Sequence, residues 1–203
     1  MYTPQVYQGP GDRGVLSERS LVTPKSGITE SAHGEIGLGS FLFVDSSVYL
    51  RAIKTADAGA NARLKYQVTK ILLADGKTPK RVQYLTKAEA NSGSYKLAVI
   101  PVGGVIFEIQ EDADGGKIAD ANAFGYCDLI VGTAADTAVG DFDGSRIVHA
   151  NIKLDSSSAS TTAGNLLMEL LGPSPQPGNP TVSATAPRRF LARVRSTLAQ
   201  ASQ

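Results

Sequence analysis

The chain has 203 residues, of which 42% are hydrophobic, and its formal net charge is +1. This length is enough for one β domain with arms, or for two small domains, and it buries an ordinary core without a metal or a disulfide. The nearly neutral charge excludes a strongly basic nucleic-acid-binding protein. With 21 glycines, 10 prolines and no tryptophan, the composition favours a turn-rich all-β chain over a helical bundle.

Residues 1–38 are predicted to form an extended N-terminal arm. Prolines and glycines interrupt them, and their hydrophobic residues show no sustained helical or strand period. These hydrophobic residues are too many for a solvated tail, so we expect the arm to lie on its own domain, on a sister subunit or on a larger partner. The residues assigned to this partner contact are Tyr2, Val6, Tyr7, Leu16 and Leu21.

Residues 39–172 are predicted to form a compact β-barrel or β-sandwich core. Their apolar residues alternate in runs bounded by turn-forming residues. The predicted strands are residues 41–44, 47–54, 64–73, 81–85, 95–100, 105–109, 126–132, 146–155 and 166–172.

Several details of this core are open to more than one interpretation. A slip in the alternation at Lys70 predicts a β-bulge, although residues 58–73 also fit a helix. Residues 166–172 fit either a last strand or a short helix. The serine-rich run of residues 155–164 is typical of a flexible exposed loop.

Residues 95–132 are the centre of the predicted core. Val105, Phe107 and Ile109 share one face of a strand, and an acidic loop separates this strand from the next apolar run. The single cysteine, Cys127, is expected to be a small buried hydrophobic side chain, and it cannot form a disulfide within one chain.

The charged residues fall into blocks along the chain. Residues 44–100 carry ten Lys or Arg against four Asp or Glu, and residues 101–143 carry one Lys against nine acids. After Asp155, four arginines stand against one glutamate. We expect these blocks to face each other, within the fold or across a subunit boundary, with separate solvated faces as the alternative.

Residues 173–203 are predicted to form a proline-rich linker followed by a basic amphipathic tail. Phe190, Leu191, Val194 and Leu198 fall near one face of a helix, which we expect to dock on a partner. The tail residues assigned to partner binding are Arg188, Arg189, Phe190, Arg193 and Arg195.

The sequence predicts no catalytic, cofactor or metal site. Two acidic segments, residues 112–115 and 141–144, resemble parts of calcium loops but lack the full set of oxygen ligands. His33 and His149 have no neighbours at metal-ligand spacing. We therefore expect a protein that is not an enzyme.

The run GYCDLIVG at residues 125–132, followed by DGSRIVHANI, completes a pattern of N-terminal arm and compact β core. This organisation resembles the capsid decoration proteins, also called cement or head-stabilising proteins, of tailed bacteriophages. The resemblance implies a homo-oligomer, dimer or trimer, that binds the major capsid protein on the outer surface of the virion and bridges capsomers. It implies manufacture in a host cytoplasm, no cofactor, and no nucleic-acid or membrane partner.

Two other functions are alternatives. One is a carbohydrate- or ligand-binding β module of a phage tail or adhesin, with exposed rings among Tyr49, Tyr66, Tyr84 and Tyr95. The other is a hydrolase assembled from dispersed residues. No apolar run has the length of a membrane helix, roughly 18 to 20 residues, and we expect a soluble protein.

Overall fold

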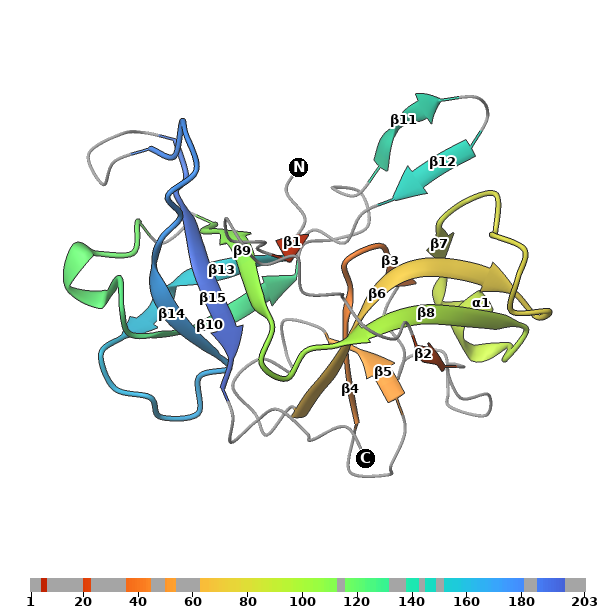
Figure 1. Cartoon of the computed structure of the whole chain (residues 1–203), viewed down its shortest axis with the longest axis horizontal. Coiled ribbons are helices and arrows are strands. Elements are labelled where there is room, and N and C mark those ends of the chain that lie inside the picture. Colours follow the sequence, from red (N-terminus) through yellow and green to blue (C-terminus); the bar gives the residue numbers. More distant parts are fainter. Residues whose placement is uncertain are drawn as a thin grey trace.

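The computed structural model describes residues 5–6, 20–22, 36–44, 50–53, 63–112, 116–131, 138–142, 145–148, 152–180 and 186–195. Within these ranges almost all regular structure is β-strand, in antiparallel sheets (Figure 1). The helical elements of the described part are the short α1 (Lys87–Asn91) and the single 3-10 turn η2 (Asp120–Asn122). The all-β fold predicted from the sequence is confirmed.

Two large sheets lie side by side, and β8 leads directly into β9 between them (Figure 1). The six-stranded sheet contains, in spatial order, β1 (Gln5–Val6), β9 (Ile106–Gln110), β15 (Arg189–Val194), β14 (Met168–Pro173), β10 (Tyr126–Val131) and β13 (Ile152–Ser160). The five-stranded sheet contains β2 (Ser20–Val22), β8 (Tyr95–Pro101), β6 (Arg63–Leu73), β4 (Phe41–Val44) and β5 (Leu50–Ala52). Two smaller sheets pair β3 (Ile36–Gly37) with β7 (Tyr84–Leu85), and β11 (Ala138–Phe142) with β12 (Ser145–Val148).

The six-stranded sheet curls but does not close into a barrel. Glu111, directly after β9, forms an isolated parallel bridge with Leu154 of β13. Next to it, the backbone N–H of Asp112 donates to the carbonyl oxygen of Leu154 at 3.0 Å. The two sides of the sheet thus meet at the end of β9, whereas the rest of β9 pairs with β1 and β15.

The two large sheets share one hydrophobic core. Its largest cluster joins Phe41 and Leu64 of the five-stranded sheet to Phe107, Phe190 and other residues of the six-stranded sheet. The rings of Phe41 and Phe107 meet edge to face, with 5.1 Å between their centroids. Such a pair adds stabilisation beyond the burial of its area, so the sheets are held together by specific packing.

Strand β4 has an apolar residue at every position because both of its faces are covered. Phe41 and Phe43 face the shared core, whereas Leu42 faces a second apolar cluster. That second cluster includes Ile36 of β3 and Leu85 of β7, which lie on the other side of the five-stranded sheet. A strand covered on both faces needs a continuous hydrophobic run in place of an alternating one.

The structure settles most of the open details of the core. Strand β6 runs through the position of the rival helix, and its pairing with β8 shifts register between Val68 and Lys70, as the predicted bulge requires. Residues 168–173 are a strand, not a helix. The predicted hairpin strand at residues 81–85 shortens to β7, because the side chain of Gln83 bonds both the N–H and the carbonyl of Ile71.

The prediction of a flexible loop at residues 155–164 is wrong over most of its length, since β13 continues to Ser160. The serine hydroxyls account for this. Ser156 donates to Asp112, and Ser158 accepts from the backbone N–H of Asp128, so these polar side chains anchor the strand. A serine-rich composition records polarity but not whether the hydroxyls have partners.

The prediction of a helical tail is also wrong. Residues 189–194 form β15, which lies between β9 and β14 inside the six-stranded sheet. Phe190, Ala192 and Val194 are buried, while the residues between them face outward, which is the period of a strand. The run of apolar residues fits both periods, and tertiary pairing decides between them. The core therefore extends past residue 172.

The burial of Phe190 gives a direct test of this placement. Replacing Phe190 by Ala leaves a cavity in the shared core, so we expect unfolding free energy to fall by about 3 to 5 kcal/mol. Leu191→Ala, on the half-buried outer face of the same strand, is the matched control and is expected to lose less. Urea unfolding measures both variants. Equal small losses would contradict a central β15 and favour a tail outside the core.

Candidate interaction site

The residues predicted to bind a partner fall in two places, the N-terminal arm and β15. In the arm, β1 pairs with β9, with Gln5 opposite Glu108 and Val6 opposite Phe107. Strand β2 pairs with β8, with Leu21 opposite Ala98. These arm segments thus lie on the chain's own domain, one of the three expected alternatives. Predicted contact residues Tyr2, Tyr7 and Leu16 lie outside the described residues.

The arm strands are antiparallel to β8 and β9, so the arm meets these two strands in the reverse of their sequence order. It pairs first with β9 of the six-stranded sheet and then with β8 of the five-stranded sheet (Figure 1). In both places it occupies the outer edge of its sheet. An uncovered sheet edge presents unpaired N–H and carbonyl groups that attract other strands, so the arm protects two edges at once.

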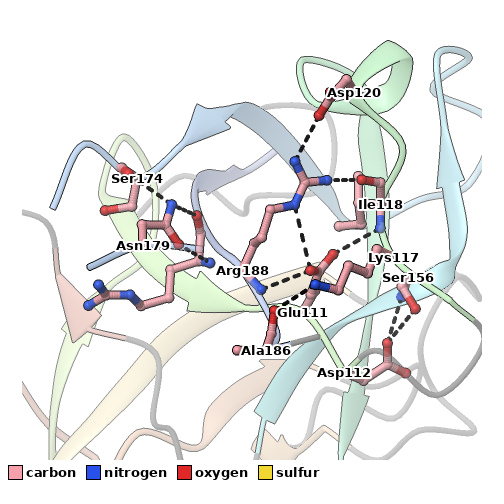
Figure 2. A network of polar contacts seen from close by, with 11 residues as sticks. Glu111, Asp112, Lys117, Ile118, Asp120, Ser156, Ser174, Asn179, Ala186 and Arg188 are labelled. Atoms are coloured by element: carbon pink, nitrogen blue, oxygen red, sulfur yellow. Dashed lines mark hydrogen bonds and ion pairs between the residues drawn. The ribbon is translucent and has the colours of Figure 1, made fainter. Parts of the chain in front are cut away.

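Arg188 is buried at the start of β15, with a relative exposure of 2%. Its Nη1 donates to Oδ1 of Asp120 at 2.8 Å, and its Nη2 donates to the carbonyl oxygen of Ile118 (Figure 2). Its guanidinium also lies over the ring of Phe190, 5.0 Å from the centroid. The guanidinium is therefore held by the chain's own atoms and is not presented to a partner.

Glu111 is the buried counterpart of Arg188. Its Oε1 accepts from the backbone N–H of Arg188 at 2.8 Å, and its Oε2 accepts from the backbone N–H of Ile118 at 2.8 Å (Figure 2). The Nε of Arg188 lies 3.7 Å from Oε1 and has no hydrogen-bond partner. We call Glu111, Ile118, Asp120 and Arg188 the Arg188 clamp. It joins the end of β9, the loop before β10 and the start of β15.

Polar groups of the chain also hold the remaining tail arginines. Arg189 pairs with Glu108 at 3.3 Å, and its backbone N–H donates to the side chain of Asn179 at 2.7 Å. Arg193 forms two hydrogen bonds with Glu169, each 2.9 Å long. Arg195 donates to the carbonyl oxygens of residues 163, 164 and 166. The predicted contact between the acidic block and the basic tail thus occurs within one subunit, at Arg189 with Glu108 and at Arg188 with Glu111 and Asp120.

The five tail residues assigned to partner binding all have contacts within the chain. Phe190 is fully buried, and Arg188, Arg189, Arg193 and Arg195 have partners within the chain. Sequence reasoning missed Glu111 and Asp120 as the partners of Arg188. The opposite charges of the two blocks were the available signal, but nothing in the spacing selects these residues.

The acidic segment at residues 112–115 is partly described. Oδ1 of Asp112 accepts from the backbone N–H of Ser156 at 3.0 Å and from its hydroxyl at 2.6 Å (Figure 2). This carboxylate therefore connects the end of β9 to β13 through hydrogen bonds. Within the described ranges, no group of three or more His, Cys, Asp or Glu side chains is placed to hold a metal ion. Residues 113–115 and both histidines lie outside those ranges.

Cys127 is buried, as predicted, and its thiol donates to the carbonyl oxygen of Asp155 at 2.9 Å. Burial raises the pKa of this thiol to about 12. Because the thiolate is the reactive form of cysteine, Cys127 is a packing residue and a poor nucleophile at neutral pH.

The tyrosines considered for a ligand platform have contacts of their own. Tyr66 and Tyr95 pack against the second apolar cluster, and Lys80 lies over the ring of Tyr95. The hydroxyl of Tyr95 donates to Glu89 at 3.3 Å. Tyr49 lies outside the described residues. Tyr66 and Tyr95 therefore have packing partners within the chain.

Comparison with protein families, with curated proteins and with solved structures finds no match for this chain. In the described part of the chain, no helix has the length and apolar character needed to cross a membrane.

The Arg188 clamp yields a stability prediction. Glu111→Gln removes a buried negative charge and leaves an amide donor facing the N–H of Ile118, so we expect a loss of about 3 kcal/mol in unfolding free energy. The matched control is Glu169→Gln, which breaks the more exposed pair with Arg193 and should cost less than about 1 kcal/mol. Chemical denaturation compares the two. Similar costs would mean that the clamp is not a principal support of the fold.

Asp128 yields a prediction about pH. Burial raises the pKa of its carboxyl, as does the charge of Asp155 opposite it, while a hydrogen bond from the N–H of Leu167 opposes the rise. The folded state thus holds this proton more tightly, and the associated stability is lost as pH rises from about 3.9 through the folded pKa. We expect Asp128→Asn to become progressively more stable relative to wild type over that window.

Asp75 is the control of opposite sign. A hydrogen bond from the Thr78 hydroxyl lowers the pKa of Asp75, with further bonds from the backbone N–H groups of Lys77 and Thr78. Its stabilisation is present above the unfolded pKa and is lost as pH falls. Asp75→Asn should therefore approach wild-type stability at low pH. Urea unfolding from pH 3 to 7 measures both variants, and parallel curves for the two would refute the assignment.

Proposed function

We propose that this protein is a virion structural protein that binds the outer surface of a phage capsid and stabilises the lattice by bridging neighbouring capsomers. The observation that carries the proposal is the N-terminal arm, which pairs with sheet edges through the short strands β1 and β2. Extended segments that add to sheet edges are a common way to bind protein surfaces, because main-chain hydrogen bonds supply affinity without a deep pocket.

The run that carries the resemblance to decoration proteins, residues 125–132, has a structural role. Gly125 passes so close to β13 that an added Cβ would lie 2.2 Å from the carbonyl oxygen of Ser160. Cys127 and Leu129 are buried in the shared core. These positions are constrained by packing, which supports reading the run as the mark of a scaffold and not of a catalytic loop.

A folded β body with an N-terminal arm suits lattice stabilisation. A protein that binds only the assembled lattice shifts the equilibrium toward it by mass action. When many copies each make two contacts, the second contact is intramolecular and avidity exceeds the affinity of either contact. In this proposal the major capsid protein is the partner, and the chain acts as a homo-oligomer on the outer capsid surface, with no catalytic role.

The carbohydrate-binding alternative has less support. Aromatic platforms for sugars require exposed rings, whereas Tyr66 and Tyr95 pack against an apolar cluster. In the described part of the chain, Phe124 is the strongly exposed ring, and it lies against Gly172. A single exposed ring is ordinary for a protein surface.

Co-sedimentation with empty heads, assembled from the major capsid protein of the same phage, tests the proposal. We expect the full chain to saturate at a fixed ratio to capsid subunits, and a variant lacking residues 1–22 to bind at least about tenfold more weakly because it loses the arm contact. Lys77→Ala, in the exposed turn after β6, is the control and should bind as wild type. Absence of saturable binding by the full chain would refute the proposal, and glycan-array binding in its place would favour the alternative.

A further inference from the structure

Strands β8 and β9 form one continuous path through both sheets, joined by the turn at residues 102–105. On its inner side, β8 has seven residues paired with β6, and β9 has five paired with β15. On its outer side, β2 pairs with three residues of β8, and β1 pairs with two residues of β9. On this outer edge, the described residues of the arm thus pair with three residues of β8 and two of β9.

The sequence keeps these two arm strands short. Pro4 directly precedes β1, and Pro24 follows β2 after one intervening residue. Proline has no backbone N–H and cannot continue a ladder of hydrogen bonds. Each arm strand is consequently a small unit that separates from its edge with the loss of few hydrogen bonds.

The arm joins the body through a long connection. Between Val22 of β2 and Ile36 of β3 the sequence has 13 residues. An extended chain spans about 3.3 to 3.6 Å per residue, so this connection reaches about 45 Å. The radius of gyration expected for 203 residues is about 17 Å. The connection is thus long enough to carry β1 and β2 to the same edge of a neighbouring molecule.

The contacts made by the arm do not depend on which copy provides it. Ser20, Leu21 and Val22 oppose Val99, Ala98 and Leu97, and the same pairs form whether the strand comes from the same chain or another. Exchange of identical elements between copies is a low-cost route to oligomers for this reason. The β8–β9 edge therefore matches the arm strands of any copy in register.

We propose that the β8–β9 edge accepts β1 and β2 of a second copy, so that the protein assembles by reciprocal exchange of N-terminal arms. The occupant is the arm itself, because its strands already match the register of this edge and its connection has the required reach. This inference concerns self-association, which the proposed function assumes, and it involves the same N-terminal arm. Arm exchange in solution does not determine which partner the outer faces of the protein contact.

Disulfide trapping in the full chain tests the exchange. In the double variant Leu21→Cys/Ala98→Cys, the two cysteines are direct cross-strand partners. Exchange predicts that mild oxidation shifts the band on a non-reducing gel from 21.2 kDa to twice that mass or more, reversibly with reductant. The buried Cys127 is present in every variant, and the wild-type chain controls for its reactivity.

A mixture of two single variants provides the second measurement. Chains carrying only Leu21→Cys, mixed with chains carrying only Ala98→Cys, should form a disulfide between unlike chains. The control mixture replaces Ala98→Cys by Gln110→Cys, at the far end of the same path on β9. If Ala98→Cys does not fold, Ser20→Cys with Val99→Cys tests the neighbouring pair of the same ladder.

Two results would overturn the proposal. One is a double variant that oxidises fully yet remains at 21.2 kDa, which would show that each arm stays on its own body. The other is the absence of a specific cross-link in folded variants of both pairs, which would show that the arm does not occupy this edge. The experiment contains no capsid, so co-sedimentation with empty heads separately decides whether the chain binds a capsid.

Discussion

The carboxylate of Glu111 is the group on which the arrangement of the six-stranded sheet most depends. It lies at the end of β9, fully buried, and accepts hydrogen bonds from the backbone N–H groups of Ile118 and Arg188. Those two residues are 70 positions apart, so one side chain fixes where the loop before β10 turns back and where β15 enters the sheet. A buried charge is costly unless it is paired and hydrogen-bonded, and Arg188 meets both requirements.

Around this clamp, β8 and β9 give the fold its continuity. One extended segment contributes a strand to each large sheet, and Phe107 of β9 meets Phe41 of the other sheet in the shared core. The clamp stabilises the far end of this segment, and the arm covers its outer edge. The two halves of the molecule are therefore joined by covalent continuity, by apolar packing and by edge pairing in the same place.

The sequence was sufficient for elements whose period is unambiguous. The alternation in β6, with its slip at Lys70, predicted both the strand and the bulge. It was insufficient where one run of residues fits two periods, as in β15, where Phe190 and Val194 satisfy a helical face and a strand face equally. The neighbouring residues in the sequence do not show which strand a segment pairs with, or whether a serine hydroxyl has a hydrogen-bond partner. The bond between Glu111 and Arg188 joins residues 77 positions apart, and no spacing rule identifies it.

Local sequence also fails to separate side chains that bind a partner from side chains that bind the chain itself. Arginines in a tail signal a binding surface only when their charges lack partners, and here carboxylates and carbonyls of the chain itself bind them. In the proposed function the arm makes the contact with the partner, through main-chain hydrogen bonds of the kind that β1 and β2 form at two sheet edges. Main-chain recognition needs few specific side chains, so its sequence signature is weak: short apolar pieces, separated by prolines, that match an edge in register.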